Sequence, residues 1–591
     1  MHGAFFLTAL LLLVATAWAD PVVTNTTTNV TYQGFLRNNV ELFLGVPYGS
    51  DTGGQNRFKP PVFAEPANGS TINATAYGPA CPQAIGRPPL FPLYTSNTTE
   101  ISEDCLNLNI ARPCGTSDGS KLPVMVWIHG GSFWFGFNGE AANAPDAMIL
   151  ESEANGLPII HVAINYRLGA FGFAQNQALR EEGSLNAGLR DQRLAIEWTK
   201  TNIELFGGDP EQITIGGQSS GGLAVGMQIV AYGGTKPAPF QQAVCESQSL
   251  EPGITGNFTY HQMDLLAAAT GCNTSSLDSN ETISCLRGLD TETLLSASIE
   301  TYSGDVSNNI GDCWLPVVDG DFLPDSPSNL VAQHRMANVT TIIGWADDDL
   351  GFFTPRTITT DNDTEDFITT YLPDMNSTSV AHLLFLYPAT DFSANPSADL
   401  SANFYRSARI FRDVLMTCMP SWMGSHLAAM GASVFLYDQN ATVLGPLLED
   451  LGATGLGPVH TSEFAYVFGN LSHYNLTDVG LPGFDPTEED FELAKRQTRS
   501  WSSFVAVGQP SLLSKETLQG WDLAFVKGDG AGEEWDPMSA EQTSVYVVGG
   551  GQPGTSTMEG EGATNAKLAA QKLKERCAFF NSEDIIRQLQ F

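Results

Sequence analysis

The chain has 591 residues and is strongly acidic, with 65 Asp and Glu residues against 28 Lys and Arg residues and a formal net charge of −37. A negative field of this size repels phosphate backbones and anionic membrane surfaces, so nucleic acid is not an expected partner. The length allows several domains, but no low-complexity linker or internal repeat divides the sequence, so we expect one large domain over residues 20–591.

The first 19 residues form a hydrophobic leader. They contain a run of about ten apolar residues and end in small residues at Ala17 and Ala19, which is typical of a cleaved secretory signal. No later run reaches the roughly 18 apolar residues that a membrane-spanning helix needs. The sequence therefore predicts a secreted, soluble protein without a membrane span.

Two further features fit export. Asn-x-Ser/Thr acceptor sites recur along the chain and predict N-linked glycans. They begin at Asn25, Asn29, Asn68, Asn73, Asn97, Asn257, Asn273, Asn280, Asn338, Asn362, Asn376, Asn440, Asn470 and Asn475. Cysteines, all after the leader, suit an oxidising compartment, and their odd number, 9, leaves at least one thiol without a partner in the chain.

Short apolar runs rich in β-branched residues alternate with helical patterns. Runs that are apolar on both faces, as buried parallel strands are, occur at 124–129, 159–164, 213–215, 341–345 and 433–437. Between the second and third runs, Leu189, Ile196 and Ile203 recur every seven residues and share one helix face. This alternation predicts an α/β fold with a mostly parallel sheet flanked by helices.

A glycine-rich loop, His-Gly-Gly-Ser-Phe at 129–133, directly follows the first of these strands. It resembles the His-Gly-Gly-Gly type of loop whose backbone N–H groups stabilise an oxyanion. Each such donor is worth roughly 10²- to 10³-fold in rate. An ordinary glycine turn at the end of a strand is the alternative interpretation.

The segment 217–221, Gly-Gln-Ser-Ser-Gly, matches the Gly-x-Ser-x-Gly turn in which a strand bends sharply into a helix and displays the central serine. A β-branched strand precedes the segment, and an apolar stretch at 223–230 follows it as a helix should. Ser219 is therefore the candidate nucleophile. Ser220 is expected to offer its backbone N–H to the oxyanion, with a side chain that need only be small.

A serine nucleophile needs a histidine base and a carboxylate that orients the base. Asp347, Asp348 and Asp349 follow the strand 341–345 directly. A run of three acidic residues is usually a solvated loop, but the carboxyl end of a strand is where a catalytic acid is expected. The pattern alone leaves open which of the three would act.

In this type of turn the chain order is serine, acid, histidine. The histidines late enough in the sequence are His382, His426, His460 and His473. His460 lies in a loop rich in Gly and Pro, the kind of segment that displays catalytic side chains, and is the candidate base. The first two fit apolar or helical segments, and His473 lies between two acceptor sites, which indicates exposed surface.

With these motifs in place, the chain resembles the type-B carboxylesterase and lipase family, the cholinesterase-like α/β-hydrolases, and is closest in pattern to secreted fungal carboxylesterases. The resemblance covers nearly the whole mature chain, with motifs at 103–109, 165–169, 206–210, 316–320 and 460–469. It implies an α/β-hydrolase fold and a serine hydrolase that cleaves carboxylic esters of small molecules through an acyl-enzyme. Such chemistry needs neither a metal nor an organic cofactor.

The resemblance also implies roles for individual residues: Ser219 as nucleophile, His460 as base, Asp349 as acid, and the N–H groups of Gly131, Ser132 and Ser220 as oxyanion donors. Four positions depart from the family pattern. Asp349 stands where glutamate is usual and is followed by Leu350 instead of glycine, so Asp348 remains an alternative acid. Gln218 stands where many members carry glutamate, and Ser132 stands at the third glycine of the oxyanion loop.

The resemblance pairs Cys81 with Cys105 and Cys272 with Cys285. In family lipases the loop closed by the first pair forms a lid over the pocket. Here prolines at 88, 89 and 92 prevent a regular amphipathic helix, so we expect a stiff rim and favour an esterase. One pairing open to Cys418 is with a late cysteine such as Cys577, and the partners of Cys114, Cys245 and Cys313 stay open.

Two alternatives to a soluble carboxylesterase remain. One is a lipase or sterol esterase that acts at a lipid interface. The other is a catalytically silent, cholinesterase-like binding module. That branch typically lacks the nucleophile and carries a membrane span, whereas this chain offers a candidate for every catalytic role and shows no span.

Overall fold

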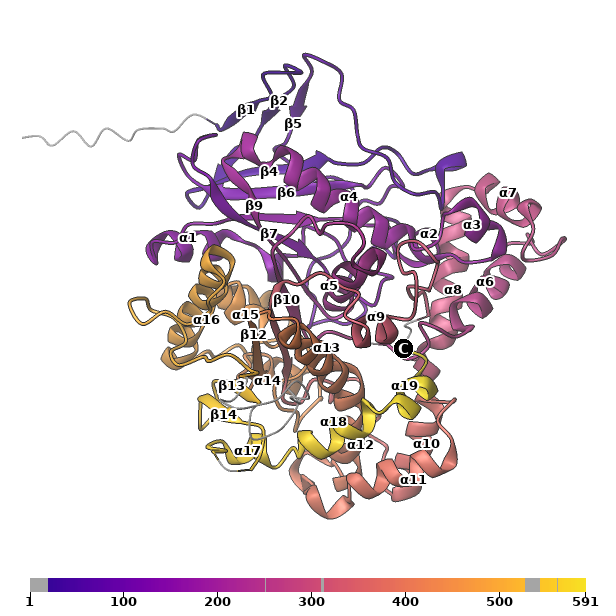
Figure 1. Ribbon diagram of the computed structural model, residues 1–591, viewed down its shortest axis with the longest axis vertical. Helices are drawn as coiled ribbons and strands as arrows, with labels where there is room; N and C mark the ends of the chain where they lie inside the picture. The colour runs from indigo at the N-terminus through magenta and orange to yellow at the C-terminus, as the bar shows by residue number, and fades with distance from the viewer. Residues whose placement is uncertain (1–19, 250, 310–312, 527–542, 561) are drawn as a thin grey trace, which may run out of the picture.

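A mixed sheet of eleven strands runs through the molecule (Figure 1). The computed structural model describes residues 20–249, 251–309, 313–526, 543–560 and 562–591. The predicted signal, residues 1–19, lies outside the described residues. Within the described part of the chain, no helix combines the length and the apolar character needed to cross a membrane.

The central strands of the sheet are parallel. In order across the sheet, the strands are β14 Gly554–Thr557, β13 Ser544–Val548, β12 Val434–Gln439, β11 Thr340–Ala346, β10 Gln242–Glu246, β9 Gly208–Gln218, β7 Leu122–Ile128, β8 Ile160–Ile164, β6 Asn107–Pro113, β4 Val40–Pro47 and β3 Phe35–Arg37. Neighbours from β13 to β8 pair in parallel, and the pairs at both edges are antiparallel. The predicted mostly parallel α/β sheet is confirmed, and the carboxyl ends of its central strands meet at one edge, where ligands bind in such folds.

The predicted strands are found where the apolar runs placed them, except that β9 is much longer than expected. Its apolar run covers only 213–215, whereas the strand extends over Gly208–Gln218. Residues 209–212 at its start are partly or fully exposed and mostly polar, so they carry no buried-strand pattern. Only the buried part of this strand was visible in the sequence.

Helices cover both faces of the sheet. They are α1 Asp146–Ala154, α2 Gly169–Phe173, α3 Gln177–Glu182, α4 Ala187–Asn202, α5 Ser220–Val230, α6 Phe258–Ala269, α7 Asn280–Gly288, α8 Thr291–Asn309, α9 Pro327–Ala332, α10 Asp361–Tyr371, α11 Ser377–Leu386, α12 Ala402–Arg412, α13 Cys418–Ala429, α14 Gly445–Asp450, α15 Phe464–Val467, α16 Glu488–Val507, α17 Ala566–Ala569, α18 Leu573–Phe580 and α19 Glu583–Leu589. Figure 1 shows α1 and α16 on one side of the sheet and α4 and α5 on the other.

Alternate residues of each central strand enter two separate cores. In β7, Val124, Val126 and Ile128 belong to the core that contains α4 and α5, whereas Met125 and Trp127 belong to the core that contains α16. Successive strand side chains point to opposite faces, so a strand apolar on both faces must be covered twice. For this reason the strand sequences lack the alternation of apolar and polar residues that a strand exposed on one face would show.

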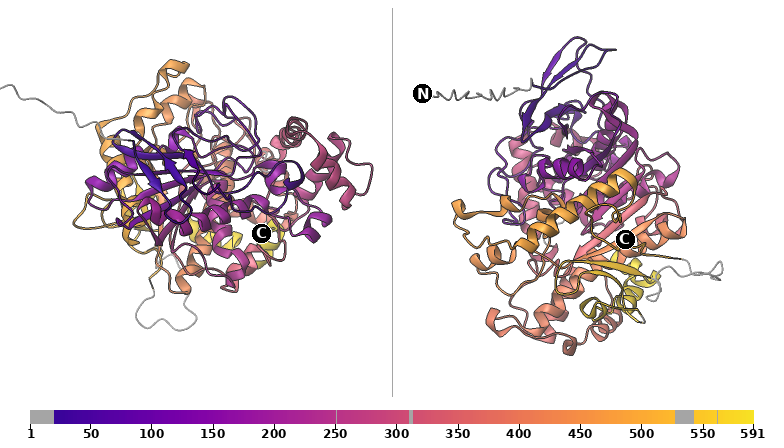
Figure 2. Two further views of the ribbon diagram at one scale, coloured as in Figure 1. Left: turned by 90° about the horizontal axis from the view of Figure 1, so that it is seen from above. Right: turned by 90° about the vertical axis from the view of Figure 1, so that its left-hand side faces the viewer.

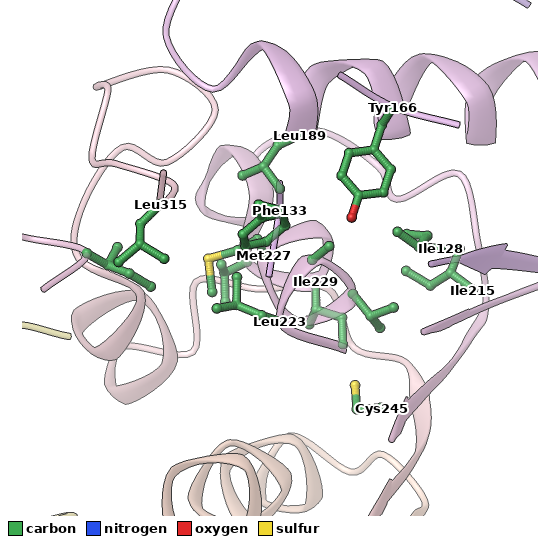
Figure 3. Close-up of a cluster of buried hydrophobic side chains, with 14 of the residues drawn as sticks. Ile128, Phe133, Tyr166, Leu189, Ile215, Leu223, Met227, Ile229, Cys245 and Leu315 are labelled. Atoms are coloured by element: carbon green, nitrogen blue, oxygen red, sulfur yellow. The ribbon is translucent and has the colours of Figure 1, made fainter. Parts of the chain in front are cut away.

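The helix after the serine turn is wholly buried against the sheet. Leu223 and Met227 of α5 lie in one hydrophobic cluster with Leu189 of α4 and the strand residues Ile128 and Ile215 (Figure 3). Such close packing fixes the start of α5, and with it the position of the preceding serine.

A small second sheet and three disulfides complete the fold. The sheet of β1 Val22–Thr24, β2 Thr31–Gln33 and β5 Thr71–Asn73 lies at one end of the molecule (Figure 2). The disulfides Cys81–Cys105 and Cys272–Cys285 are present as predicted. Cys418 pairs with Cys577, which ties α13 to α18.

Candidate active site

The segment 217–221 forms a sharp turn between β9 and α5. β9 ends at Gln218 and α5 begins at Ser220, which leaves Ser219 at the bend with φ 61° and ψ −129°. A positive φ is uncommon in a residue other than glycine and is typical of functional turns. A Cβ atom on Gly217 would lie 2.5 Å from the carbonyl oxygen of Gly221, and one on Gly221 would lie 2.2 Å from that of Ile128. Both glycines are therefore required by close backbone contacts.

Two loops bring a histidine and a carboxylate together near this turn. His460 Nδ1 donates to Asp349 Oδ1 at 2.5 Å, and the His460 backbone N–H donates to the Asp349 carbonyl at 3.0 Å. The other carboxylate oxygen, Oδ2, accepts from Ser247 Oγ at 2.7 Å and from the Ala346 backbone N–H at 2.8 Å. Asp349 is thus fixed by donors on both oxygens, and it holds a proton on His460 Nδ1, which leaves Nε2 to act as a base.

The three adjacent aspartates point in different directions. Asp348 Oδ2 accepts from the backbone N–H of Gly457 at 2.9 Å, and burial raises the pKa of Asp348 to about 6. Asp347 instead pairs with Lys567 at 2.6 Å and with Arg409 at 3.6 Å. Only Asp349 of the three bonds to His460, so the structure brings together the pair that the family resemblance favoured.

Gln218 also contacts the imidazole of His460. Its Nε2 lies 3.2 Å from His460 Nε2 and 3.4 Å from Nδ1, and its Oε1 accepts from the hydroxyl of Tyr94 at 3.1 Å. Among the described residues, no hydrogen bond joins Ser219 to His460. Contacts between catalytic groups are often long before substrate binds and tighten in the reacting complex.

The glycine-rich loop after β7 passes beside Ser219. A Cβ atom on Gly130 would lie 3.1 Å from the Cβ of Ser219. Gly131 and Ser132 both have positive φ, 105° and 53°. Within the described part of the chain, the backbone N–H groups of Gly131, Ser132 and Ser220 donate to no other residue. These donors are therefore available to an oxyanion.

The side chain of Ser220 does more than the sequence suggested. Its Oγ accepts from the backbone N–H of Phe133 at 3.3 Å, so it joins the serine turn to the glycine-rich loop. Phe133 is itself anchored in the hydrophobic cluster around α5 (Figure 3). This hydrogen bond therefore fixes the distance between the serine turn and the glycine-rich loop, which together form the candidate oxyanion site.

Buried acids near His460 have pKa values above the ordinary range. Burial raises the pKa of Glu246 to about 8, and Trp501 Nε1 donates to its Oε1 at 2.6 Å. The pKa of Glu463 is also raised, first by burial and then by the neighbouring charges of Glu246 and Asp349. Glu246 is therefore largely protonated near pH 7, and the raised pKa of Glu463 likewise favours its neutral form.

The loop closed by Cys81 and Cys105 reaches the site through Tyr94. Residues 88–94 form turns and contain no helix, in agreement with the proline pattern. Thr461, next to His460, donates from Oγ1 to the carbonyl of Leu93 at 3.3 Å. This loop is therefore a rim bonded directly to the candidate site.

The other candidate histidines lie outside the site. His382 stacks on Phe579, and His426 lies 3.1 Å from His334. His473 is not on the exposed surface as expected: it is half-buried, and its Nε2 contacts Thr95 Oγ1 of the disulfide-closed loop at 2.5 Å.

Ser247 was not among the site residues predicted from the sequence. It follows β10 as Asp349 follows β11, and only the pairing of those strands places the two side chains together.

The fold and this arrangement define an α/β-hydrolase: a mostly parallel sheet, a strand–serine–helix turn, and a histidine–carboxylate pair at the carboxyl edge. A sequence model of the Carboxylesterase family matches residues 22–561. The chain belongs to this family.

Individual relatives cover nearly the whole chain. A secreted lipase of Arthroderma benhamiae is 48% identical over 582 residues, which span 98% of each protein. The inactive carboxylesterase-like protein VdtD of Byssochlamys spectabilis is 35% identical over 577 residues, or 95% of this chain and 94% of that protein. The crystal structure of Aspergillus niger EstA superposes with a TM-score of 0.74 at 26% identity and covers 97% of this chain and 99% of EstA. Since one relative is inactive, the activity of this chain has to be argued from its own residues.

Proposed function

We propose that this protein is an active serine carboxylesterase in which Ser219 is the nucleophile, His460 the general base and Asp349 the orienting acid. The observation that carries the proposal is the buried 2.5 Å contact between His460 Nδ1 and Asp349 Oδ1, beside a strained serine turn. Two further donors hold the buried Asp349 carboxylate in a position that fixes the imidazole in one tautomer.

The reaction would proceed in two halves. His460 Nε2 takes the proton of Ser219 Oγ as the oxygen attacks the ester carbonyl carbon, which forms a tetrahedral oxyanion. The imidazolium then gives that proton to the leaving alcohol as the carbon–oxygen bond breaks and the acyl-enzyme remains. Water, deprotonated by the same imidazole, repeats the attack and releases the acid and free Ser219. The Asp349 side chain orients the ring and stabilises the imidazolium.

Gly131, Ser132 and Ser220 would bind the oxyanion through their backbone N–H groups. Serine in place of the third glycine leaves this donor intact, because the backbone supplies it. The positive φ of Ser132 is a strained conformation that the contact between Ser220 and Phe133 helps to maintain.

For the substrate class we favour soluble esters over lipid surfaces. The turns at 88–94 provide a rim bonded to Thr461 and Gln218, without an amphipathic helix that could open onto an interface. The competing proposal, a lipase, is favoured by the name of the Arthroderma relative. Rates measured through the solubility limit of an ester distinguish the two, since an interfacial enzyme accelerates sharply there.

We also propose that the mature protein is secreted and forms one domain over residues 20–591. The leader pattern and the secreted Arthroderma relative support the first point. A single sheet that takes strands from Phe35 to Thr557 supports the second.

The decisive experiment replaces Ser219 with Ala. We expect kcat for a soluble nitrophenyl ester to fall by about 10⁶-fold, as when other serine hydrolases lose the nucleophile, while the melting temperature stays close to that of the wild type. Covalent labelling of the wild type by a fluorophosphonate, and none of the variant, would place the reaction at this residue. A wild-type protein that is folded but neither labelled nor active would be a silent binding module instead.

A further inference from the structure

A groove away from Ser219 opens between three segments that are far apart in the sequence. Its walls come from residues 252–258, from the end of α10 and from the end of α19, and its volume is about 360 Å³. This falls within the range of roughly 300–1,000 Å³ typical of ligand pockets. Neither Ser219 nor His460 lines it, so the groove is separate from the candidate active site.

A predicted glycan acceptor lies on the wall of this groove. Asn257 is exposed and begins the motif Asn257-Phe258-Thr259. It occupies the N-cap position of α6, where an asparagine side chain usually accepts from the first helical N–H groups, yet it makes no such bond. The Oδ1 atom is therefore not held by the helix, and the side-chain amide can turn with a sugar attached to Nδ2.

Asn376, another acceptor near the end of α19, provides a contrast. It caps α11 through Oδ1, which accepts from Thr378 and Ser379, and its Nδ2 donates to Gln588 Oε1 at 3.0 Å. Its polar atoms are already engaged in holding α11 and α19. Of the two acceptor sites, Asn257 is the one whose side-chain amide makes no such hydrogen bond.

The groove offers the surfaces that a sugar ring binds. Phe258, Leu372 and Pro373 provide apolar contact area, and Thr370, Asp374 and Gln590 provide polar groups. A ring with an apolar face and a hydroxyl rim fits walls of this mixed character. A second cavity of about 560 Å³ shares Asn257 but is lined mainly by polar and charged residues such as Gln177, Arg180 and Asp278.

We propose that the first sugars of an N-linked glycan on Asn257 lie in the 360 Å³ groove and hold α19 against α6 and α10. Two backbone bonds already join these parts, from Gly253 N–H to the Leu589 carbonyl and from Thr255 N–H to the Gln590 carbonyl, both at 3.0 Å. The glycan covers the open side of this junction. The proposal does not depend on ester hydrolysis.

The test is site-resolved deglycosylation of the native protein, purified from a glycosylating fungal secretory host and read by peptide mass spectrometry. The matched control is Asn68, an exposed acceptor that lines neither cavity. We expect endoglycosidase to release the Asn257 glycan at least about tenfold more slowly than the Asn68 glycan, because cleavage must wait for local opening, and equally fast after denaturation. An unmodified Asn257, or equal release from the native protein, overturns the proposal.

Two pairs of variants test whether the glycan lies in this groove and whether it stabilises α19. Thr370→Trp fills the groove and should make the Asn257 glycan as sensitive as the control, whereas Gln177→Trp, in the larger cavity, should not. The reverse result would place the glycan in the larger cavity and refute this assignment. Asn257→Gln should also speed hydrogen exchange in α19, with no such change in Asn68→Gln, and unchanged exchange would rule out the bracing role.

Discussion

Replacement of Asp349 by Asn tests the orienting acid of the proposed triad. In the wild type, Oδ1 of Asp349 accepts from His460 Nδ1, while Oδ2 accepts from Ser247 Oγ and from the Ala346 N–H. An asparagine has one acceptor oxygen instead of two. Its NH₂ group must therefore face either the histidine or the Ala346 N–H.

The second orientation sets two donors against each other in a fully buried place, which costs about 1–3 kcal/mol. The first orientation is therefore favoured, and it forces His460 Nδ1 to accept a hydrogen bond. The ring proton then sits on Nε2, where it blocks the removal of the Ser219 proton. The same change in other serine hydrolases lowers kcat by about 10⁴-fold, which corresponds to about 5 kcal/mol of transition-state stabilisation.

The matched control is Asp348→Asn, one residue earlier. The amide oxygen can still accept from the Gly457 N–H, so kcat should stay within about threefold of the wild type, a change of less than about 1 kcal/mol. Both variants are assayed for kcat with a soluble nitrophenyl ester and for folding by thermal denaturation. If Asp348→Asn abolishes activity and Asp349→Asn does not, the acid has been assigned to the wrong residue.

Asp348→Asn should also change the pH dependence of the protein's stability. The pKa of Asp348 is raised to about 6 in the folded protein, above its value in the unfolded chain, so the folded state binds the proton more tightly. The contribution of Asp348 to the free energy of unfolding is greatest at low pH and declines as pH rises toward about 6. Asp348→Asn should accordingly be more stable than the wild type above pH 6, and equal to it near pH 4.

Other predictions concern the oxyanion loop, a buried acid and a disulfide. Ser132→Gly keeps the backbone donor and relieves a positive φ, so kcat should change by less than about threefold; a loss of two orders of magnitude would show that the hydroxyl matters. Burial raises the pKa of Glu246 to about 8, so wild-type melting temperatures should fall as pH rises toward 8, and Glu246→Gln, which keeps an acceptor for Trp501, should flatten that decline. A parallel slope in both proteins would contradict the raised pKa. Replacing Cys418 and Cys577 by Ser opens a link between residues 159 positions apart and should lower the free energy of unfolding by about 5 kcal/mol, measured by denaturant titration.

Local sequence determined the serine turn and the oxyanion loop. Each lies within five consecutive residues, where glycines are required because the backbone passes too close to itself or to a neighbouring strand for a side chain. Apolar runs likewise located the central strands, because a strand buried on both faces leaves no polar position in its pattern. These features could be predicted from the sequence because the steric or burial constraint acts on the same few consecutive residues that form the motif.

Relationships between distant segments were decided only by the tertiary structure. Three neighbouring aspartates look alike in sequence, yet the packing of β10, β11 and the loop before α15 sends Asp349 alone to His460. The contact of Gln218 with His460, the support from Ser247 and the pairing of Cys418 with Cys577 have the same origin. Side-chain direction at the end of a strand depends on which elements pack around it, and those elements lie a hundred or more residues away.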